Sequence, residues 1–252
     1  MGDFGLKLVF LGVAGSVPAR NHNTVSLLVE NYLLDCGEGA VRVLQELRLI
    51  DKVDKVLITH AHADHFSGVV SLIWYFMLTG RNRELLIVGP KGIENATLIA
   101  LKTFNTPLNR VKGWLEFQEL DAGEKLGEIR AAEARHPIPS LAYRLDLDKS
   151  LCYTGDTSPS REIVELAKNC TLLVHDSTYP SGMEKEALND GHSTARDAGR
   201  IARESNVKML ALVHLPYYRF PSEEFAKEYV QAAAQQFEGE VFVPKELKRY
   251  IL

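Results

Sequence analysis

Four side chains that can bind metal ions lie within six consecutive positions of this chain. Residues 59–65 read T-H-A-H-A-D-H and directly follow an apolar run. His60 and His62 are two residues apart, so at the end of a strand they project to the same side. Asp64 and His65 then point from the turn that follows. The alternative is a polar surface loop, but ionisable groups rarely cluster in this way beside a buried strand, so the stretch predicts a site for one or two metals.

The chemical type of these ligands indicates which metals they bind. Imidazole and carboxylate groups suit zinc, and the same ligand preferences allow manganese or iron. Cys36, Cys152 and Cys170 lie far apart with no C-x-x-C pair, which argues against both a thiolate zinc site and a disulfide framework. This use of cysteine favours a reducing, cytoplasmic location.

Elements that position this cluster can be predicted from the pattern of apolar residues. Short apolar runs alternate with helical patterns, and turn residues separate them. Thr194 followed by Asp197 is typical of a capping box, Ser222 is typical of a second helix start, and residues 69–78 predict a buried helix. Strands are expected at residues 7–12, 25–29, 32–34, 55–59, 85–88, 129–133, 141–145, 150–153, 171–174, 209–213 and 241–243. Mixed strands and helices without a linker predict a layered α/β sandwich in a single domain, residues 1–252.

Composition excludes several classes of protein. Of the 252 residues, 46% are hydrophobic and 25% are charged, which is the profile of an ordinary globular chain and excludes disordered and collagen-like proteins. The formal charge is −4, so no global positive field attracts nucleic acid or a membrane surface. We therefore expect no membrane partner, and a local site must attract any anionic substrate.

The metal-binding cluster matches the H-x-H-x-D-H signature of the metallo-β-lactamase superfamily residue for residue, and the whole chain resembles that family. The family's other motifs follow in the expected order. They are an Asp in L-L-D-C-G-E-G, a His before a proline, an Asp in Y-T-G-D-T and a His in L-V-H-L. These residues are Asp35, His136, Asp156 and His214. Taken alone, each would favour a structural role, and it is their combination that supports the resemblance.

The resemblance implies a four-layer αβ/βα sandwich with two mixed sheets flanked by helices, and a site for two Zn²⁺ ions, with Mn²⁺ or Fe²⁺ as alternatives. One metal would be held by His60, His62 and His136, and the other by Asp64, His65 and His214. Asp156 would bridge them. Asp35 would support the ligands from outside, or only hydrogen bond the turn at residues 37–39. Two such metals roughly 3.5–4 Å apart acidify a water and stabilise charge on the group attacked.

Within the superfamily, the chain looks most like ribonuclease Z, the endonuclease that trims the 3′ end of precursor tRNA, and its phosphodiesterase relatives. Residues 18–26 are similar to the family's P-x-x-x-R-N-x-S loop. There Arg20, with Asn21 or Asn23, would bind phosphate, unless the loop is only a solvated turn. Because the tRNA-processing relatives form dimers, the resemblance also allows a homodimer.

A second local resemblance concerns proton transfer. In G-H-S-T, His192 corresponds to the family's histidine that protonates the leaving oxygen, and Ser193 and Thr194 follow it at a helix start that suits an anion. Asp176 in H-D-S-T-Y replaces the Glu that usually supports this histidine. With Asp64 as acceptor of the water's proton, these residues would complete the catalytic set. A histidine that merely begins a helix is the alternative.

Departures from the family pattern concern the substrate. Ribonuclease Z usually carries a long arm that grips the tRNA elbow, whereas here only a tight turn at residues 146–150 joins two strands. We therefore expect a dinuclear metal-dependent phosphodiesterase, with precursor tRNA as one possible substrate. One alternative is hydrolysis of a small non-RNA ester, namely a cyclic phosphodiester, lactone, thioester or sulfate ester. The other is a non-catalytic RNA-binding member.

Overall fold

The first β-sheet is built from the N-terminal half of the chain together with the last strand. The computed structural model describes residues 5–220 and 222–252, and within them it forms two sheets of seven strands each. In spatial order, the first sheet contains β14 (Arg249–Ile251), β1 (Lys7–Gly12), β2 (Ser26–Val29), β3 (Tyr32–Leu34), β4 (Lys55–Leu57), β5 (Leu85–Pro90) and β6 (Leu115–Leu120). Pairing is antiparallel from β14 to β3 and parallel from β3 to β6, so the sheet is mixed.

A second mixed sheet follows the same plan. In spatial order, it contains β13 (Glu240–Phe242), β12 (Met209–Val213), β11 (Leu172–Asp176), β10 (Ser150–Tyr153), β9 (Leu141–Asp146), β8 (Ile129–Glu133) and β7 (Lys125–Leu126). Strands β10 to β13 are parallel, and β7 to β10 pair antiparallel. The pairing of Ser150 with Asp146 joins β9 to β10 through a short turn, residues 147–149.

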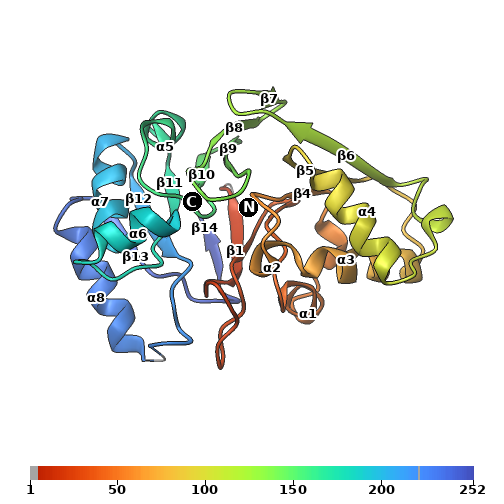
Figure 1. The fold of residues 1–252 in the computed structure, drawn as a ribbon, viewed down its shortest axis with the longest axis horizontal. Helices are drawn as coiled ribbons and strands as arrows, with labels where there is room; N and C mark the ends of the chain where they lie inside the picture. The colour runs from red at the N-terminus through yellow and green to blue at the C-terminus, as the bar shows by residue number, and fades with distance from the viewer. Residues whose placement is uncertain (1–4, 221) are drawn as a thin grey trace.

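Helices cover the outer face of each sheet (Figure 1). On the first sheet lie α1 (Ala40–Glu46), α3 (Gly68–Thr79) and α4 (Ile93–Thr103), with the short α2 (Ala63–Phe66) near one end. On the second sheet lie α5 (Arg161–Ala167), α7 (Ala195–Glu204) and α8 (Glu223–Ala234), with α6 (Glu184–Asp190) beside them. Single 3₁₀ turns occur at Ile50–Lys52 and Leu108–Arg110. The arrangement confirms the predicted four-layer αβ/βα sandwich.

Alternation of side chains along the strands explains the layering. In β1, Leu8 and Phe10 join the apolar cluster between the sheets, whereas Val9 and Leu11 join the cluster under α1 and α3. Successive strand residues point to opposite faces, so a strand that is apolar at every position must be covered on both sides. A sheet of such strands is stable only with another sheet on one face and helices on the other.

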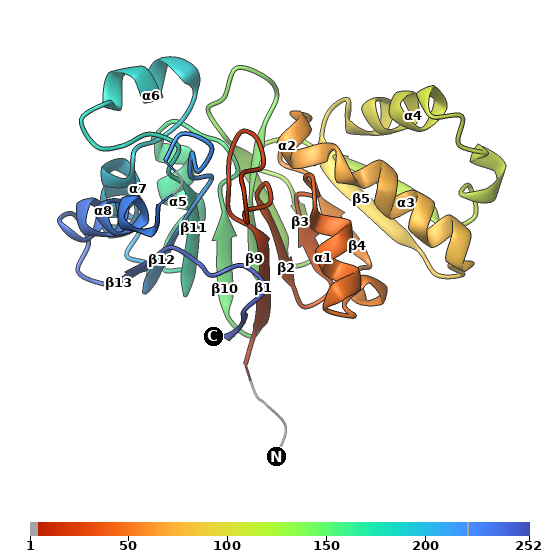
Figure 2. The same cartoon turned by 90° about the horizontal axis from the view of Figure 1, so that it is seen from below.

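The parallel strands of both sheets end at the same end of the sandwich. In Figure 2, α2, α6 and the loop between β1 and β2 gather at the top, while the C-terminus lies at the bottom. Ligands in α/β sheets bind outside the carboxyl ends of parallel strands, because loops from neighbouring strands converge there. Residues that follow β3, β4, β10, β11 and β12 are therefore brought together.

All eleven predicted strands are present, with ends shifted by no more than two residues, but the sequence pattern missed three strands. β6, β7 and β14 were not expected, because polar residues interrupt the apolar positions of β6, and β7 and β14 are only two and three residues long with one charged residue each. Asp64 and His65 lie in α2 and not in a turn. None of the helices in the described part of the chain is long and apolar enough to cross a membrane.

The cap of α7 offers a test of local stability. The Thr194 hydroxyl accepts a hydrogen bond from the Asp197 backbone N–H at 3.1 Å, and the Asp197 carboxylate accepts one from the Thr194 N–H at 3.3 Å, so the predicted capping box is present. Thr194→Ala should lower the free energy of unfolding by about 1 kcal/mol, measured by urea denaturation. Thr194→Ser loses the same methyl group but keeps the oxygen, and it should retain most of that stability. Equal losses in both variants would contradict a capping role.

Candidate metal centre and active site

The predicted metal ligands come from both sheets and meet at one end of the sandwich. His60 and His62 follow β4, and Asp64 and His65 lie in α2. The remaining ligands follow strands of the second sheet: His136 follows β8, Asp156 follows β10 and His214 follows β12. Both groups of residues that the sequence assigned to a metal are close enough to share one, because the ligand atoms within each group lie within 4.8 Å of one another.

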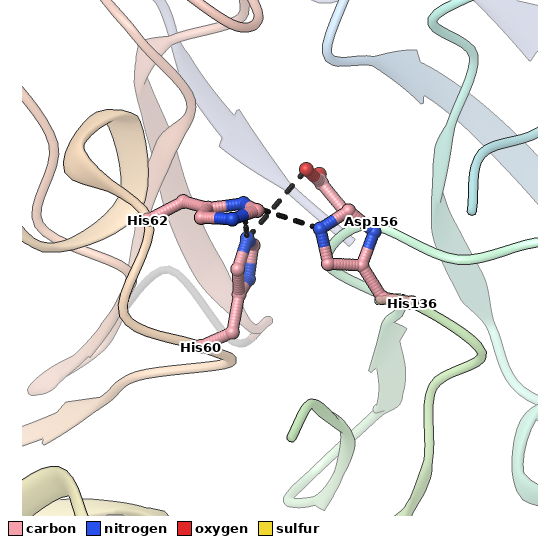
Figure 3. A group of neighbouring side chains, drawn as sticks. All are labelled: His60, His62, His136 and Asp156. Atoms are coloured by element: carbon pink, nitrogen blue, oxygen red, sulfur yellow. Dashed lines mark hydrogen bonds and ion pairs between the residues drawn. The ribbon is translucent and has the colours of Figure 1, made fainter. Parts of the chain in front are cut away.

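The first group consists of His60, His62, His136 and Asp156, which point toward one another from three loops, with His60 and His62 on the same one (Figure 3). The Nδ1 atom of His62 lies 3.1 Å from Nε2 of His60 and 3.2 Å from Nε2 of His136. An oxygen of Asp156 lies 3.7 Å from Nε2 of His60. His60 and Asp156 are buried and His62 is exposed, so the group opens to solvent on the His62 side.

The second group consists of Asp64, His65, Asp156 and His214, all buried. The Nε2 atom of His214 lies 3.0 Å from an Asp64 oxygen and 3.3 Å from an Asp156 oxygen. The Nε2 atom of His65 lies 3.2 Å from that same Asp156 oxygen. Asp156 thus belongs to both groups, one oxygen facing each, which is the arrangement that a bridging ligand requires.

Hydrogen bonds to groups outside the cluster orient four of the histidines so that their Nε2 atoms face inward. The Nδ1 atom of His136 donates to the Gly191 carbonyl at 3.0 Å, and Nδ1 of His65 donates to Asp35 at 2.7 Å. Nδ1 of His60 lies 3.0 Å from the Thr59 hydroxyl, and Nδ1 of His214 lies 2.7 Å from the Thr178 hydroxyl. Because each Nδ1 is occupied in this way, the lone pair of each Nε2 faces the cluster, as metal-bound histidines require.

Unpaired buried atoms show that these residues fit a metal. Among the described residues, the Nε2 atom of His65 and one oxygen of Asp156 are buried without a hydrogen-bond partner, which is costly unless a cation binds them. Burial, together with the neighbouring His65, lowers the pKa of His60 to about 2, so His60 is in the neutral form that binds metal. Burial opposes ionisation of Asp156, but the surrounding histidines hold its pKa well below the usual range. We conclude that the cluster is a metal site.

Asp35 supports the cluster from beneath. Its buried carboxylate accepts hydrogen bonds from His65 Nδ1 at 2.7 Å, the Tyr153 hydroxyl at 2.7 Å and the Thr59 backbone N–H at 2.7 Å. Asp35 follows β3 with φ +54°, a left-handed conformation that non-glycine residues rarely adopt. The sequence left open whether Asp35 only holds the Gly37 turn, and these contacts place it against His65, one of the predicted metal ligands.

His192 and Asp176 lie beside the cluster and contact one another. Nδ1 of His192 lies 2.9 Å from an Asp176 oxygen, and the Thr178 hydroxyl donates to the other Asp176 oxygen at 2.6 Å. Burial disfavours a proton on His192, but the charge of Asp176 and their hydrogen bond outweigh that effect and raise the pKa of His192 to about 9. His192 therefore carries a proton at neutral pH, and Nδ1 is the ring nitrogen that faces Asp176.

Three of the predicted substrate-binding residues form hydrogen bonds with other parts of the protein, and a fourth lines a different groove. The Asn23 amide donates to the Leu11 carbonyl at 2.9 Å and to Glu246 at 3.3 Å. Ser193 is buried and donates to the Thr157 carbonyl at 2.7 Å. Thr194 caps α7, and Asn21 lines a groove with residues of the C-terminal segment. Arg20 is exposed in the loop between β1 and β2.

Sequence reasoning missed two residues that support the site. Thr178 connects Asp176, His192 and His214 through one hydroxyl. It was visible as the fourth residue of the H-D-S-T-Y motif, but its role depends on distances that a motif does not give. Gly15 is the second, because a Cβ atom there would lie 2.2 Å from the His214 ring, so only glycine lets this loop approach.

Comparison with known proteins agrees with the site. Residues 30–215 match the family described as the beta-lactamase superfamily domain, and the chain belongs to that family. The fold and site therefore define a metal-dependent hydrolase of this superfamily. Among its relatives is the ribonuclease Z of Methanothermobacter thermautotrophicus, 29% identical over an alignment covering 83% of this chain and 86% of the relative. The predicted resemblance to ribonuclease Z is confirmed.

Solved structures share the fold over almost the whole chain. The metallo-beta-lactamase fold protein YhfI from Bacillus subtilis aligns with a TM-score of 0.83 and 23% identity, covering 98% of this chain and 99% of that one. Human tRNase Z, short form, aligns with a TM-score of 0.78 and 22% identity, covering 97% and 98%. At these identities the two structures establish the fold.

Asp35 provides a test of how the ligands are held. Asp35→Asn replaces one accepting oxygen by an NH₂ group, so either His65 or Thr59 loses its acceptor. Loss of such a support typically weakens metal binding about 10- to 100-fold. We expect that loss in a competition titration with a chromophoric chelator. Asp54→Asn, a half-exposed carboxylate that pairs with Arg81 at 3.2 Å, is the matched control and should bind metal like the unaltered protein. Unchanged affinity in Asp35→Asn would exclude a role in holding the ligands.

Proposed function

We propose that this chain is a dinuclear metal-dependent phosphodiesterase of the ribonuclease Z type. The observation that carries the proposal is the juxtaposition of two ligand groups that share Asp156 with a second pair, His192 and Asp176, poised to transfer a proton. A storage or structural metal site does not need a proton donor beside it. Hydrolysis of a poor leaving group does.

The donor set suggests which ions the chain holds. His60, His62 and His136 would hold one ion, Asp64, His65 and His214 the other, with Asp156 between them. The mixture of imidazole and carboxylate suits Zn²⁺, and Mn²⁺ or Fe²⁺ fit the same donors. When bound, two such ions supply an acidified water and stabilise negative charge on the phosphate oxygens.

The chain's own residues supply the remaining steps. Asp64, whose carboxylate lies 3.0 Å from Nε2 of His214, would accept the proton of the attacking water. His192 releases the proton on Nε2 to the leaving oxygen, while Asp176 stabilises the imidazolium before transfer. Thr178 holds Asp176 in place, so the donor keeps one orientation.

Precursor tRNA is the substrate suggested by the relatives named ribonuclease Z. The two ends of the β9–β10 turn are only a few residues apart, at Asp146 and Ser150, where ribonuclease Z usually carries its tRNA-gripping arm. A small phosphodiester is therefore the second candidate substrate. The proposed reaction is the same for both, because it depends on the metal ligands and on His192.

A variant at His192 tests the proton transfer. His192→Ala should lower kcat about 100- to 10,000-fold on a dinucleotide, whose sugar oxygen needs a proton to leave. The loss should be far smaller on bis-p-nitrophenyl phosphate, because p-nitrophenolate leaves as a stable anion. Metal content, measured by elemental analysis, should not change. Equal losses on both substrates would contradict a role in protonating the leaving group.

Parallel incubations test the substrate class. Zinc- or manganese-loaded protein should hydrolyse bis-p-nitrophenyl phosphate, and EDTA or Asp64→Ala should abolish that activity. We expect cleavage of precursor tRNA at its 3′ end as well, with a weak dependence of binding on salt, because few phosphate contacts are available without an arm. Cleavage of the small ester alone would assign the enzyme to small phosphodiesters. No hydrolysis of either substrate would refute the proposed function.

A further inference from the structure

A cavity of about 200 Å³ opens beside the proton donor. His192 and Thr178 form its inner wall. Its outer walls come from two segments that are far apart in the sequence, one carrying Tyr179 and the other carrying residues 218–220. This cavity includes none of the residues that the sequence assigned to substrate binding, and His192 is the only predicted catalytic residue among the described residues that line it.

The position of His192 determines which part of a substrate this cavity receives. Because Nδ1 of His192 faces Asp176, the proton that leaves the ring must be carried by Nε2. A general acid transfers its proton within hydrogen-bond distance of the leaving oxygen. The leaving oxygen therefore lies against His192, and the group attached to it occupies the cavity that His192 lines.

The walls of the cavity are aromatic and unusually exposed. Tyr218 is 45% exposed and Phe220 is 43% exposed, although large aromatic side chains normally bury most of their surface. Phe220 is held by stacking on Phe225, with ring centroids 4.9 Å apart and planes 24° apart. Exposed aromatic rings that are fixed in place offer flat surfaces on which a nucleobase stacks.

Charges around the cavity favour a polar ring or an anionic neighbour over an alkyl chain. The guanidinium of Arg219 lies 5.4 Å from the centre of the Tyr218 ring, and in the described part of the chain no carboxylate forms an ion pair with it. Asp190, the one carboxylate among the described residues that line the cavity, accepts a hydrogen bond from the Tyr179 hydroxyl. The cavity thus offers a cation that no described carboxylate neutralises, while its own carboxylate is engaged.

We propose that this cavity is the leaving-group subsite and that it binds the base of the nucleoside released from the phosphodiester, stacked on Tyr218. The proposal rests on the proposed function, since it needs His192 as the proton donor. A cavity of about 150 Å³ is large enough for benzene, so the space suits a single base and not a base pair. The subsite selects substrates by the group that leaves.

Two dinucleotides that differ only in the leaving base test this proposal. Manganese-loaded full-length protein is given adenylyl-(3′→5′)-uridine or its analogue with hydrogen in place of adenine. Both release the same sugar oxygen. We expect kcat/KM to be about tenfold higher with the base, in line with the contribution of one stacked base. The ratio should fall to near one in Tyr218→Ala and persist in Tyr218→Phe, which keeps the ring.

A matched control and a binding measurement complete the test. Phe104→Ala removes another exposed aromatic ring, 62% exposed at the end of α4, and should keep the tenfold ratio. Saturation-transfer NMR with adenosine and metal-free protein should show contacts to the base protons that disappear in Tyr218→Ala. A wild-type ratio near one, or adenosine contacts that persist in Tyr218→Ala, would refute the proposed subsite without contradicting the proposed hydrolase activity. Inactivity on bis-p-nitrophenyl phosphate would instead refute the proposed function, and the NMR result would still decide the subsite.

Discussion

Asp156 is the residue on which the rest of the site depends. Its carboxylate is buried between histidines of the two sheets, with one oxygen near His60 and the other near His65 and His214. A buried charge is costly unless opposite charge and hydrogen bonds compensate it. Histidines alone do so only when protonated, yet their hydrogen bonds direct the Nε2 lone pairs inward. A metal held by each of the two groups would satisfy both requirements, which explains why the histidine nitrogens converge on Asp156.

The sandwich supplies the rigidity that such a centre needs. Ligands from β4 and α2 must meet ligands from β10 and β12, although the strands belong to different sheets. The apolar cluster between the sheets, which includes Leu57 and Leu151, fixes that distance because packed interiors deform little. Positive φ angles at Asp35 and His214 are the local cost, since each residue turns sharply where its strand ends. Core packing thus determines ligand geometry.

The features that could be predicted from the sequence are those whose residues lie close together in the chain. The H-x-H-x-D-H stretch occupies six consecutive positions, and strands such as residues 7–12 are almost entirely apolar, so both could be located by pattern alone. β14 could not, because its residues alternate with charge and pair with β1 from the opposite end of the chain. Asn23 resembled a phosphate ligand until its contacts with Leu11 and Glu246 were visible. Roles that depend on distant partners escape a pattern.

Different parts of this fold determine the reaction and its substrate specificity. The metal ligands follow strand ends and are constrained by the core, so they persist wherever the sandwich persists. The walls beside His192 come from residues 179–180 and 218–220, which lie in connecting segments that the core does not constrain. Such segments change in length and sequence without disturbing the strands. Family membership therefore determines the type of reaction, whereas the loops determine which leaving group is accepted. Because the turn between β9 and β10 is short, the walls of this cavity contribute more to substrate specificity.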